Sequence, residues 1–133
     1  MLRKLPLITP VNAAFWQGGE VGELRICHCA ACGRYFHPPS PACPRCASED
    51  VAPRAVSGQA TVATFTVNHQ AWTAGLDVPY VVAIVELVEQ ASLRLVTNLV
   101  GMPPGEVRIG MPVSVRFLQQ EDVWLPLFER TVA

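Results

Sequence analysis

All five cysteines of this 133-residue chain lie within one stretch of twenty residues, from Cys27 to Cys46. Four of them form two Cys-x-x-Cys pairs, Cys29 with Cys32 and Cys43 with Cys46, and ten residues separate the pairs. Two such turns facing each other can place four thiolates at the corners of a tetrahedron, as structural zinc prefers, with Zn–S bonds of about 2.3 Å. The spacing therefore predicts a structural zinc site on these four cysteines.

Two other uses of the same four cysteines remain open at this stage. Iron fits four thiolates equally well and would give a rubredoxin-like electron carrier, and the sequence alone does not separate the two metals. The long apolar-rich segment after Cys46 favours zinc, because an electron carrier of this kind does not need it. A redox-active Cys-x-x-Cys pair is disfavoured because two such pairs lie within eighteen residues.

The fifth cysteine and two nearby histidines are not expected to bind the metal. Cys27 would share a strand face with Cys29 but has no partner at the right separation. We interpret Cys27 as a small apolar residue on the strand that enters the metal-binding segment. Four thiolates leave no vacancy for His28 or His37, and His37 precedes two prolines, which is typical of a loop.

Charge and hydropathy indicate the cellular compartment in which the protein is expected. The N-terminal segment MLRKLPLITPV is basic, but Pro6 and Pro10 interrupt its short apolar run, so it does not match a signal peptide. No span approaches the roughly 20 apolar residues of a membrane helix. We therefore expect a cytoplasmic protein, with reduced thiols that favour metal over disulfides. With a net charge of −1, no general attraction to nucleic acid or anionic lipid is expected.

A short helix is predicted before the cysteine segment. Thr9 is a suitable N-cap, Pro10 suits the first helical position, and Gly18 and Gly19 offer a stop. Such a helix has about two turns and does not persist in isolation, so it must dock on something. Its aromatic residues face either the chain's own core or a partner.

After Pro53 the sequence changes to short apolar segments separated by turns. Five of them carry strand patterns: GQATVATFTVNH, YVVAIVELVE, ASLRLVTNLVG, PVSVRFLQQ and VWLPLFER. Alternation in the first segment places two sets of side chains on opposite faces: Ala63, Phe65 and Val67 on one, and Val62, Thr64 and Thr66 on the other. The second segment is apolar on both faces, which predicts a central strand. In the third, Leu93, Leu95 and Thr97 alternate with Arg94 and Val96.

These patterns predict a mainly β protein. The expected parts are an N-terminal helical segment, a zinc ribbon, and a small five-stranded Greek-key barrel of the OB-fold type with a C-terminal tail, over residues 1–21, 22–56 and 57–133 respectively. A nucleic-acid-binding barrel is disfavoured by charge. From residue 56 onward there are four basic and seven acidic residues, whereas a groove that follows a phosphate backbone needs the opposite balance.

The order of these pieces resembles a known family. It consists of small proteins with a rubredoxin-like zinc ribbon followed by an acyl-CoA-associated OB domain. The resemblance covers nearly the whole chain and rests on FWQGGEVGELRICHCAACGRYFHPP, CPRC, GQATVATFTVNH, PYVVAIVEL, NLVG, IGMPVSVRF and LPLF. In the family pattern the metal ligands fall on the same four cysteines, and Cys27 lies outside it. Ala47 stands where a glycine is usual.

The resemblance implies a role beside an enzyme rather than as one. Members accompany thiolase-fold enzymes that act on acyl-CoA thioesters: acyltransferases, thiolases and lipid-transfer-protein-like retro-aldolases. This chain is similar to the stand-alone form and to the domain that accompanies a steroid side-chain aldolase. The resemblance suggests a hetero-oligomer in which two copies flank an enzyme dimer, and in which acyl-CoA binds through the complex. The second hypothesis is an independent acyl-CoA-binding module.

The residues agree with a non-catalytic role. His69 ends the first barrel strand without an adjacent carboxylate, and no glycine-rich phosphate loop or nucleophile elbow occurs. A zinc ion held by four thiolates has no open site for water. Aromatic and aliphatic residues in the helix, in the loop NHQAWTAGLDVP and in the tail are candidate partner contacts: Phe15, Trp16, Trp72, Leu76, Trp124 and Phe128. The alternative is that most of them fill the core.

Four arginines surround the cysteine segment: Arg25, Arg34, Arg45 and Arg54. The simpler interpretation is that they solvate the surface and offset the −2 charge of a Zn(Cys)₄ centre. The second interpretation is that some of them contact the phosphates of coenzyme A.

Overall fold

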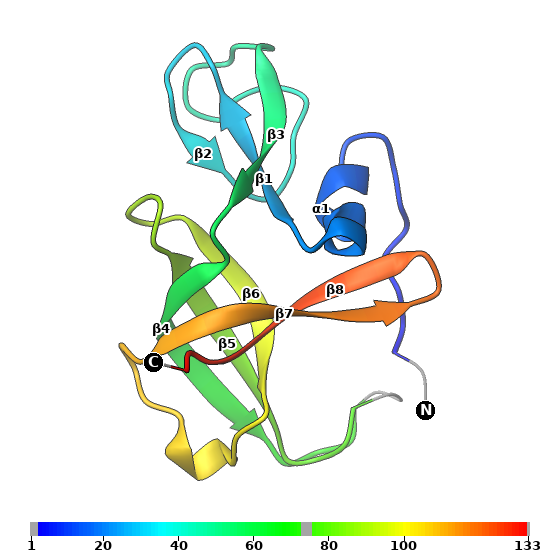
Figure 1. Ribbon diagram of the computed structural model, residues 1–133, viewed down its shortest axis with the longest axis vertical. Helices are drawn as coiled ribbons and strands as arrows, with labels where there is room; N and C mark the ends of the chain where they lie inside the picture. Colours follow the sequence, from blue (N-terminus) through cyan, green and yellow to red (C-terminus); the bar gives the residue numbers. More distant parts are fainter. Residues whose placement is uncertain (1–2, 73–75, 133) are drawn as a thin grey trace.

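Two sheets, one above the other, carry most of the regular structure in the computed structural model (Figure 1), which describes residues 3–72 and 76–132. The helical elements are α1 (Ala13–Gln17) and the 3₁₀ turns η1 (Gly18–Val21) and η2 (Pro104–Glu106). The strands are β1 (Leu24–Cys29), β2 (Tyr35–Phe36), β3 (Val51–Val56), β4 (Gln59–Asn68), β5 (Tyr80–Leu87), β6 (Arg94–Val100), β7 (Pro112–Gln120) and β8 (Val123–Arg130). The mainly β fold with one short N-terminal helix is as predicted.

The N-terminal helix differs from its prediction at both ends. Thr9 and Asn12 exchange hydrogen bonds: the Thr9 N–H donates to Asn12 Oδ1 (2.7 Å) and the Asn12 N–H donates to Thr9 Oγ1 (3.3 Å). This closed turn precedes α1, which begins after Asn12. Gly18 ends the α-helical part but does not stop the helical path, which tightens into a 3₁₀ turn as far as Val21. The chain reverses at Gly22, whose φ of +75° suits glycine.

The helical segment lies against β1 and the β7–β8 hairpin (Figure 1). The packing is tight at Gly19: a Cβ atom added there would lie 2.4 Å from Trp124 Cβ and 2.6 Å from Phe117 Cδ1. Because real Cβ atoms do not come so close, only glycine lets the segment pack at this depth. Phe15, which precedes Gly19 in the same segment, is 6% exposed and belongs to the main core.

The smaller sheet has the order β2-β1-β3 and is antiparallel throughout. Side chains of the β5–β6 turn attach it to the barrel. Gln90 forms two hydrogen bonds with the backbone of Tyr35, at 2.9 Å each: Oε1 accepts from the N–H and Nε2 donates to the carbonyl. Nearby, the Ser57 N–H donates to Glu89 Oε2 at 2.8 Å. These contacts fix the orientation of the small sheet relative to the barrel.

The five remaining strands form a closed barrel in the order β4-β5-β6-β8-β7. Every pairing is antiparallel except that of β6 with β8, which is parallel and spans only two residue pairs, Leu99 with Phe128 and Val100 with Glu129. A five-stranded barrel of this kind is an OB-fold, as the sequence predicts. Beyond these two pairs the ladder between β6 and β8 stops.

The strand patterns predict most of the barrel core, with one correction in β4. The alternation predicts Val62 on the face opposite Phe65 and Val67, yet Val62 is 1% exposed and belongs to the same core. The cause is a shift of the β4–β5 register between Val62 and Thr64, where Ala63 is the extra residue. Such a bulge moves later side chains to the other face of the sheet. The predicted alternation in β6 and the central position of β5 between two strands are confirmed.

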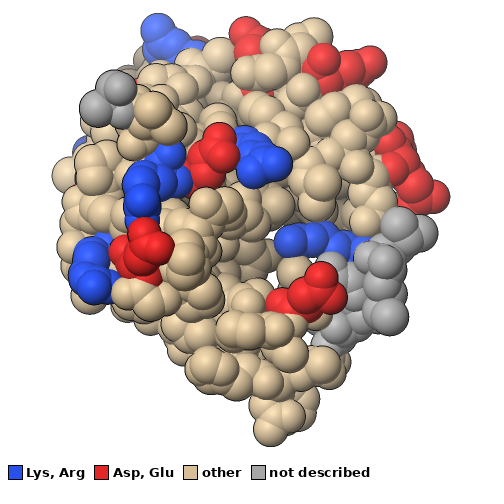
Figure 2. Space-filling model, turned by 60° about the horizontal axis from the view of Figure 1, so that its bottom comes forward, with Lys and Arg blue, Asp and Glu red and all other residues tan. Residues whose placement is uncertain are grey.

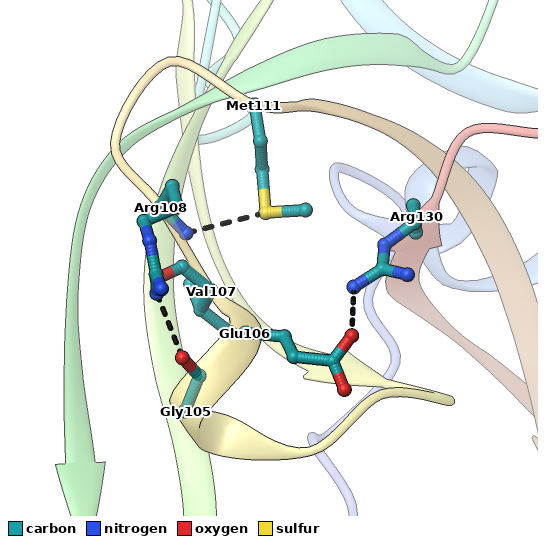
Figure 3. Close-up of polar contacts among 6 residues, drawn as sticks. All are labelled: Gly105, Glu106, Val107, Arg108, Met111 and Arg130. Atoms are coloured by element: carbon teal, nitrogen blue, oxygen red, sulfur yellow. Dashed lines mark hydrogen bonds and ion pairs between the residues drawn. The ribbon is translucent and has the colours of Figure 1, made fainter.

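The connection from β6 to β7 lies at the lower end of the barrel in Figure 1, and Figure 3 shows its polar contacts. Val107, just after η2, is 1% exposed and joins the core. The Arg108 guanidinium donates to the carbonyls of Gly105 (2.7 Å) and Val107 (2.8 Å), which holds the turn shut. Arg130 of β8 donates to Glu106 at 2.7 Å and ties the turn to the last strand. In the described part of the chain, no helix has the length and hydropathy needed to cross a membrane.

We predict that Gly19→Ala destabilises the zinc-loaded protein. The added methyl group must push the helical segment away from the β7–β8 hairpin, and overpacking of this kind costs about 1–3 kcal/mol of the free energy of unfolding. Gly105→Ala is the matched control, because a Cβ there meets no atom within 4 Å. Urea denaturation measures both. Equal denaturation midpoints for the two variants would show that the close contact at Gly19 does not matter.

Candidate functional site

The first Cys-x-x-Cys pair lies in a tight turn between β1 and β2. The Cys29 N–H donates to the Arg34 carbonyl (2.9 Å), and the Gly33 N–H donates back to the Cys29 carbonyl (2.8 Å). Gly33 has a φ of +75°, which glycine adopts without a steric penalty. The turn therefore presents the sulfurs of Cys29 and Cys32 on the same side.

The second pair lies in a turn with the same hydrogen bonds. The Cys43 N–H donates to the Ser48 carbonyl (2.8 Å), and the Ala47 N–H donates to the Cys43 carbonyl (2.9 Å). Ala47 holds the position that Gly33 holds in the first turn, and it too is left-handed, with a φ of +63°. A side chain in this conformation costs about 1–2 kcal/mol. The turn geometry thus explains why a glycine is the usual residue here.

The two turns bring four sulfurs together. The Sγ atoms of Cys29 and Cys46 are 3.6 Å apart, those of Cys32 and Cys43 are 3.7 Å apart, and all four lie within 4.8 Å of one another. Zn–S bonds of about 2.3 Å in a tetrahedron require S–S separations of about 3.8 Å. The four cysteines therefore fit zinc in both donor type and spacing, and they form the metal centre of a structural zinc site.

The pKa values of the clustered thiols also favour a bound cation. The backbone N–H groups of Cys46 and Arg45, with two neighbouring thiols, lower the pKa of Cys43 to about 7 despite burial. At Cys46 the Ser48 backbone N–H also lowers the pKa of the thiol. The neighbouring sulfurs, Cys29 above all, and burial together have the larger effect, and they raise the pKa of Cys46 to about 11. Four adjacent thiols do not all ionise together at neutral pH unless a metal ion replaces their protons.

A very small apolar cluster supports the metal site. It comprises Cys27, Cys29, Phe36 and Cys43, with Val51 packed against it, and it is separate from the barrel core. Cys27 is 9% exposed and packs here, and it is not among the four clustered ligands, in line with its interpretation as a small apolar residue. A cluster of this size cannot stabilise a sheet alone, so the metal must supply much of the stability.

Neither histidine of the ribbon reaches the sulfurs. His37 packs on the Phe15 ring, with ring centroids 4.6 Å apart, and burial lowers its pKa to about 4, so it is neutral at physiological pH. His28 packs edge-on against Tyr35 at 4.8 Å, and its Nε2 lies 3.4 Å from Arg54 Nη1. The metal is therefore held by thiolates alone among the described residues.

Two of the residues predicted to contact a partner are core residues. Phe128 is 0% exposed and fills the centre of the barrel, and Phe15 at 6% exposed anchors the helical segment to it. Neither ring is available to a partner in this conformation, because each has already been removed from solvent by the chain itself. The alternative interpretation, that aromatic residues fill the core, describes these two.

The other four lie nearer the surface. Trp72, in the β4–β5 loop, is 76% exposed, which is unusual for so large an apolar side chain. Leu76 in the same loop is half-buried, and residues 73–75 between them lie outside the described residues. Trp16 and Trp124 are half-buried on α1 and β8. Trp72 therefore leaves the largest apolar area open to contact.

The four arginines of the ribbon fall into two groups with different surroundings. Arg25 forms an ion pair with Glu23 (2.7 Å), and Arg54 faces His28. Arg34 and Arg45 instead line one cavity at the junction of ribbon and barrel, together with Arg94 of β6. Sequence reasoning missed Arg94 because it lies about fifty residues further along the chain, and only the docking of the β5–β6 turn on the ribbon brings it there.

A metal-braced ribbon joined to an OB-fold barrel defines the class of this protein, and comparisons identify the family. Residues 16–52 match the family model described as ChsH2, rubredoxin-like zinc ribbon domain. Residues 53–118 match the model described as ChsH2, C-terminal OB-fold domain. The chain superposes on one chain of a solved structure titled Ltp2-ChsH2(DUF35) aldolase with a TM-score of 0.86 and 40% identity, covering 96% of this chain and 100% of that one. The chain belongs to the ChsH2 (DUF35) family of zinc-ribbon and OB-fold proteins.

Relatives in the family have names that indicate different roles. A probable enoyl-CoA hydratase alpha subunit of Thermomonospora curvata is 40% identical over 98% of this chain, and a 3-oxo-4,17-pregnadiene-20-carboxyl-CoA hydratase alpha subunit of Mycobacterium tuberculosis is 39% identical over 84% of it. The chain spans only 41% and 35% of the length of those two proteins. A DUF35 domain-containing scaffold protein of Methanocaldococcus jannaschii is 35% identical over 67% of the chain, which covers 63% of that protein. A DUF35 protein of Sulfolobus solfataricus shares the fold, with a TM-score of 0.64 at 18% identity.

We predict opposite effects for exchanging the two residues that close the turns. Ala47→Gly removes the left-handed strain and tightens zinc binding by about 0.5–1 kcal/mol, after allowance for the extra flexibility of glycine. Gly33→Ala introduces the same strain and weakens zinc binding by about 1 kcal/mol. The new methyl group in the second variant meets no atom within 4 Å, so conformation alone is tested.

Competition with a chromophoric zinc chelator measures both affinities. A change of 1 kcal/mol corresponds to about a fivefold shift in the dissociation constant. Effects of the same sign in the two variants would mean that the left-handed conformation does not limit metal binding.

Proposed function

We propose that this chain is a non-catalytic accessory subunit that binds and completes a thiolase-superfamily aldolase acting on acyl-CoA thioesters, in the breakdown of steroid side chains. The observation that carries the proposal is the match, over the full length of that chain, to one chain of the structure titled Ltp2-ChsH2(DUF35) aldolase. The scaffold and hydratase-subunit names of its relatives point the same way. We expect two copies on an enzyme dimer, working in the cytoplasm, where the thiols stay reduced.

The geometry of the chain supports an accessory rather than a catalytic role. Four thiolates complete a tetrahedral shell, so a zinc ion here has no position for a reacting water. Within residues 3–72 and 76–132 no histidine hydrogen-bonds to a carboxylate, the pairing that general base catalysis commonly uses. His37 is neutral and half-buried, and its ring packs on Phe15. The site chemistry is therefore structural.

The surface supports a protein partner rather than a nucleic acid. On the face of the barrel in Figure 2, acidic and basic side chains are interspersed among uncharged ones, and no continuous basic stripe follows a groove. Two arginines near this end are paired with carboxylates, Arg130 with Glu106 and Arg116 with Glu129. We propose that Trp72, with Leu76, Trp16 and Trp124, contacts the enzyme, because large exposed aromatic side chains are typical anchors of interfaces.

An independent acyl-CoA-binding module is the second candidate function. The observation that favours it is the convergence of Arg34, Arg45 and Arg94 on one cavity, since guanidinium groups bind phosphate well. The two functions are compatible, because an accessory subunit can also hold part of the substrate of its enzyme.

Co-purification from the native host, followed by co-expression of the identified partner, tests the proposal. We predict retro-aldol cleavage of a 3-hydroxyacyl-CoA by the complex and no turnover by this chain alone. Loss of activity on omitting the chain, with recovery on adding it back, is the expected result. Thioester turnover by the isolated chain, or a partner that is fully active without it, would contradict the accessory role.

We further predict that Trp72→Ala weakens association with that partner. A central aromatic anchor contributes about 2 kcal/mol or more, equivalent to about a thirtyfold rise in the dissociation constant. Ile109→Ala is the control, because Ile109 is 69% exposed in a different loop, the β6–β7 connection. Surface plasmon resonance with the immobilised partner gives both constants. Unchanged affinity for Trp72→Ala removes this loop from the interface.

A further inference from the structure

Strand β6 is paired with β8 over only part of its length. The β6–β8 ladder consists of two residue pairs at the end of β6, Leu99 with Phe128 and Val100 with Glu129. On its other side, the ladder of β6 with β5 runs back as far as Arg94. The first half of β6 therefore has one unpaired edge within the part of the chain that the structure describes. Unpaired strand edges are the places where another extended chain can add.

The β6–β8 ladder stops at Pro126. In the parallel register of this ladder, residue 126 is the next position of β8 whose backbone groups face β6. An N–H there would donate to the Val96 carbonyl, but proline has no N–H. The Thr97 hydroxyl donates to the Pro126 carbonyl instead, at 2.9 Å. Before this contact, no hydrogen bond joins β6 to β8 among the described residues.

The backbone groups on the unpaired edge can be assigned from the ladder with β5. The Leu87 N–H donates to the Leu93 carbonyl at 2.8 Å, and every second residue of an antiparallel strand faces the same neighbour. Leu95 therefore hydrogen-bonds toward β5. The N–H and C=O groups of Arg94 and Val96 point the other way, toward the space that β8 leaves open.

A cavity of about 890 Å³, here called the β6 groove, lies beside this edge. Its apolar lining includes three aliphatic side chains that are unusually exposed. Val96 is 72% exposed although it is part of a strand, and Leu7 and Val11 of the N-terminal segment are 83% and 45% exposed. Exposed apolar residues gathered around one groove are typical of an interaction site.

The β6 groove carries positive charge at both ends. Arg94 lies at the start of β6, and Arg3 lies at Asn98, where its Nη1 donates to Oδ1 at 2.9 Å. These two positions of β6 are four residues, or about 13 Å, apart. Arg94 uses its Nε on Glu86 (3.2 Å), which leaves its terminal nitrogens for another acceptor. No acidic side chain of the described residues lines the groove, so a carboxylate would complement it.

These features fit an extended polypeptide better than a helix. A strand offers the N–H and C=O groups that the edge at Arg94 and Val96 lacks, and β-augmentation uses this main-chain pairing. A helix has already used its own backbone groups. A second copy of this chain, pairing β6 with β6 about Val96, would bring Arg94 of each copy toward Arg3 of the other. Like charges would then meet across the pair.

We propose that the unpaired edge of β6 binds an extended segment of the partner enzyme as an added strand. An apolar side chain of that segment lies on Val96, and a carboxylate of the segment binds Arg94. The proposal rests on the proposed function, because it takes the enzyme as the source of the segment. It adds a main-chain contact, on the β6 side of the barrel, to the contact proposed for Trp72.

Amide hydrogen exchange, resolved residue by residue, tests the main-chain pairing. The zinc-loaded chain is compared alone and in complex with the co-purified enzyme. We expect the amides of Arg94 and Val96 to exchange freely in the isolated chain and at least ten times more slowly in the complex. The Leu95 amide, which faces β5, should be protected in both states. The amide of Ile109 in the β6–β7 connection is the control and should not change.

Two substitutions test the backbone and the charge separately, with affinities measured by surface plasmon resonance on the immobilised enzyme. Val96→Pro removes an N–H that faces the groove rather than β5 and should weaken binding at least tenfold. Val96→Thr keeps that N–H and should stay within about threefold of the wild type. Arg94→Glu should weaken binding at least tenfold. Arg116→Glu, at a β7 arginine that is also paired with a carboxylate, should not change it.

Zinc content and far-ultraviolet circular dichroism establish that each variant is folded. If Val96→Pro does not fold, Arg94→Glu and the exchange experiment decide. Wild-type affinity in Arg94→Glu, or unchanged exchange at Arg94 and Val96 in the complex, overturns the proposal. Protection of the same two amides in the isolated chain, together with a dimer in sedimentation, would assign the edge to a second copy and overturn it as well.

The proposed function is measured separately, by omitting the chain from the enzyme and adding it back. An enzyme that needs this chain, in a complex where the β6 edge still exchanges freely, would refute the added strand and leave the accessory role standing. A chain for which no enzyme partner co-purifies would refute both.

Discussion

The four sulfurs around one zinc ion are the constraint on which the rest of this structure depends. The separate core around the metal has only four buried residues, three of them cysteines, while Leu24 and Ile26 of β1 belong to the main core, so the cysteine turns have little apolar surface to stabilise them. The metal ion replaces that missing core by holding two otherwise independent turns face to face. The turns carry Arg34 and Arg45, and the ribbon supplies one wall of the cavity at the barrel junction. Local coordination chemistry thus sets the shape of the cavity beside the metal site.

The barrel is attached to the zinc-braced ribbon by hydrogen bonds. Gln90 and Glu89, in the β5–β6 turn, hydrogen-bond to the backbone of Tyr35 and Ser57, so the ribbon cannot rotate freely on the barrel. The helical segment packs across the β7–β8 hairpin through Gly19 and contributes Phe15 to the main core. The three parts are therefore held in one arrangement, which suits the accessory role proposed above.

The sequence predicts those features that depend on local chemistry or on short periodicities. The spacing of the cysteines is sufficient for the metal centre, because two identical turns suffice to build it. Alternation predicts the faces of β6, where Leu95 is buried and Val96 exposed. The prediction fails where the periodicity changes within a strand. No residue pattern in β4 indicates the bulge that turns the Val62 side chain toward the core.

Features that depend on contacts between distant segments could not be predicted. An aromatic residue near a chain end is as compatible with an interface as with a core, and only the closed barrel shows that Phe128 fills the core. Likewise, the sequence names the arginines of the ribbon but not Arg94, because their convergence follows from the docking of Gln90 on Tyr35. The expectation of an accessory role comes from the family resemblance, because the residues of one chain do not indicate its partner.

Hydrogen–deuterium exchange before and after removal of zinc tests the central claim most directly. If the ion braces the ribbon, chelation should abolish the protection of amides in β1, β2 and β3, while amides in β5 and β7 remain protected. Zinc measured in the same sample should be one ion per chain before chelation. If the ribbon amides stay protected in the metal-free chain, the sheet folds without zinc and the claim is contradicted.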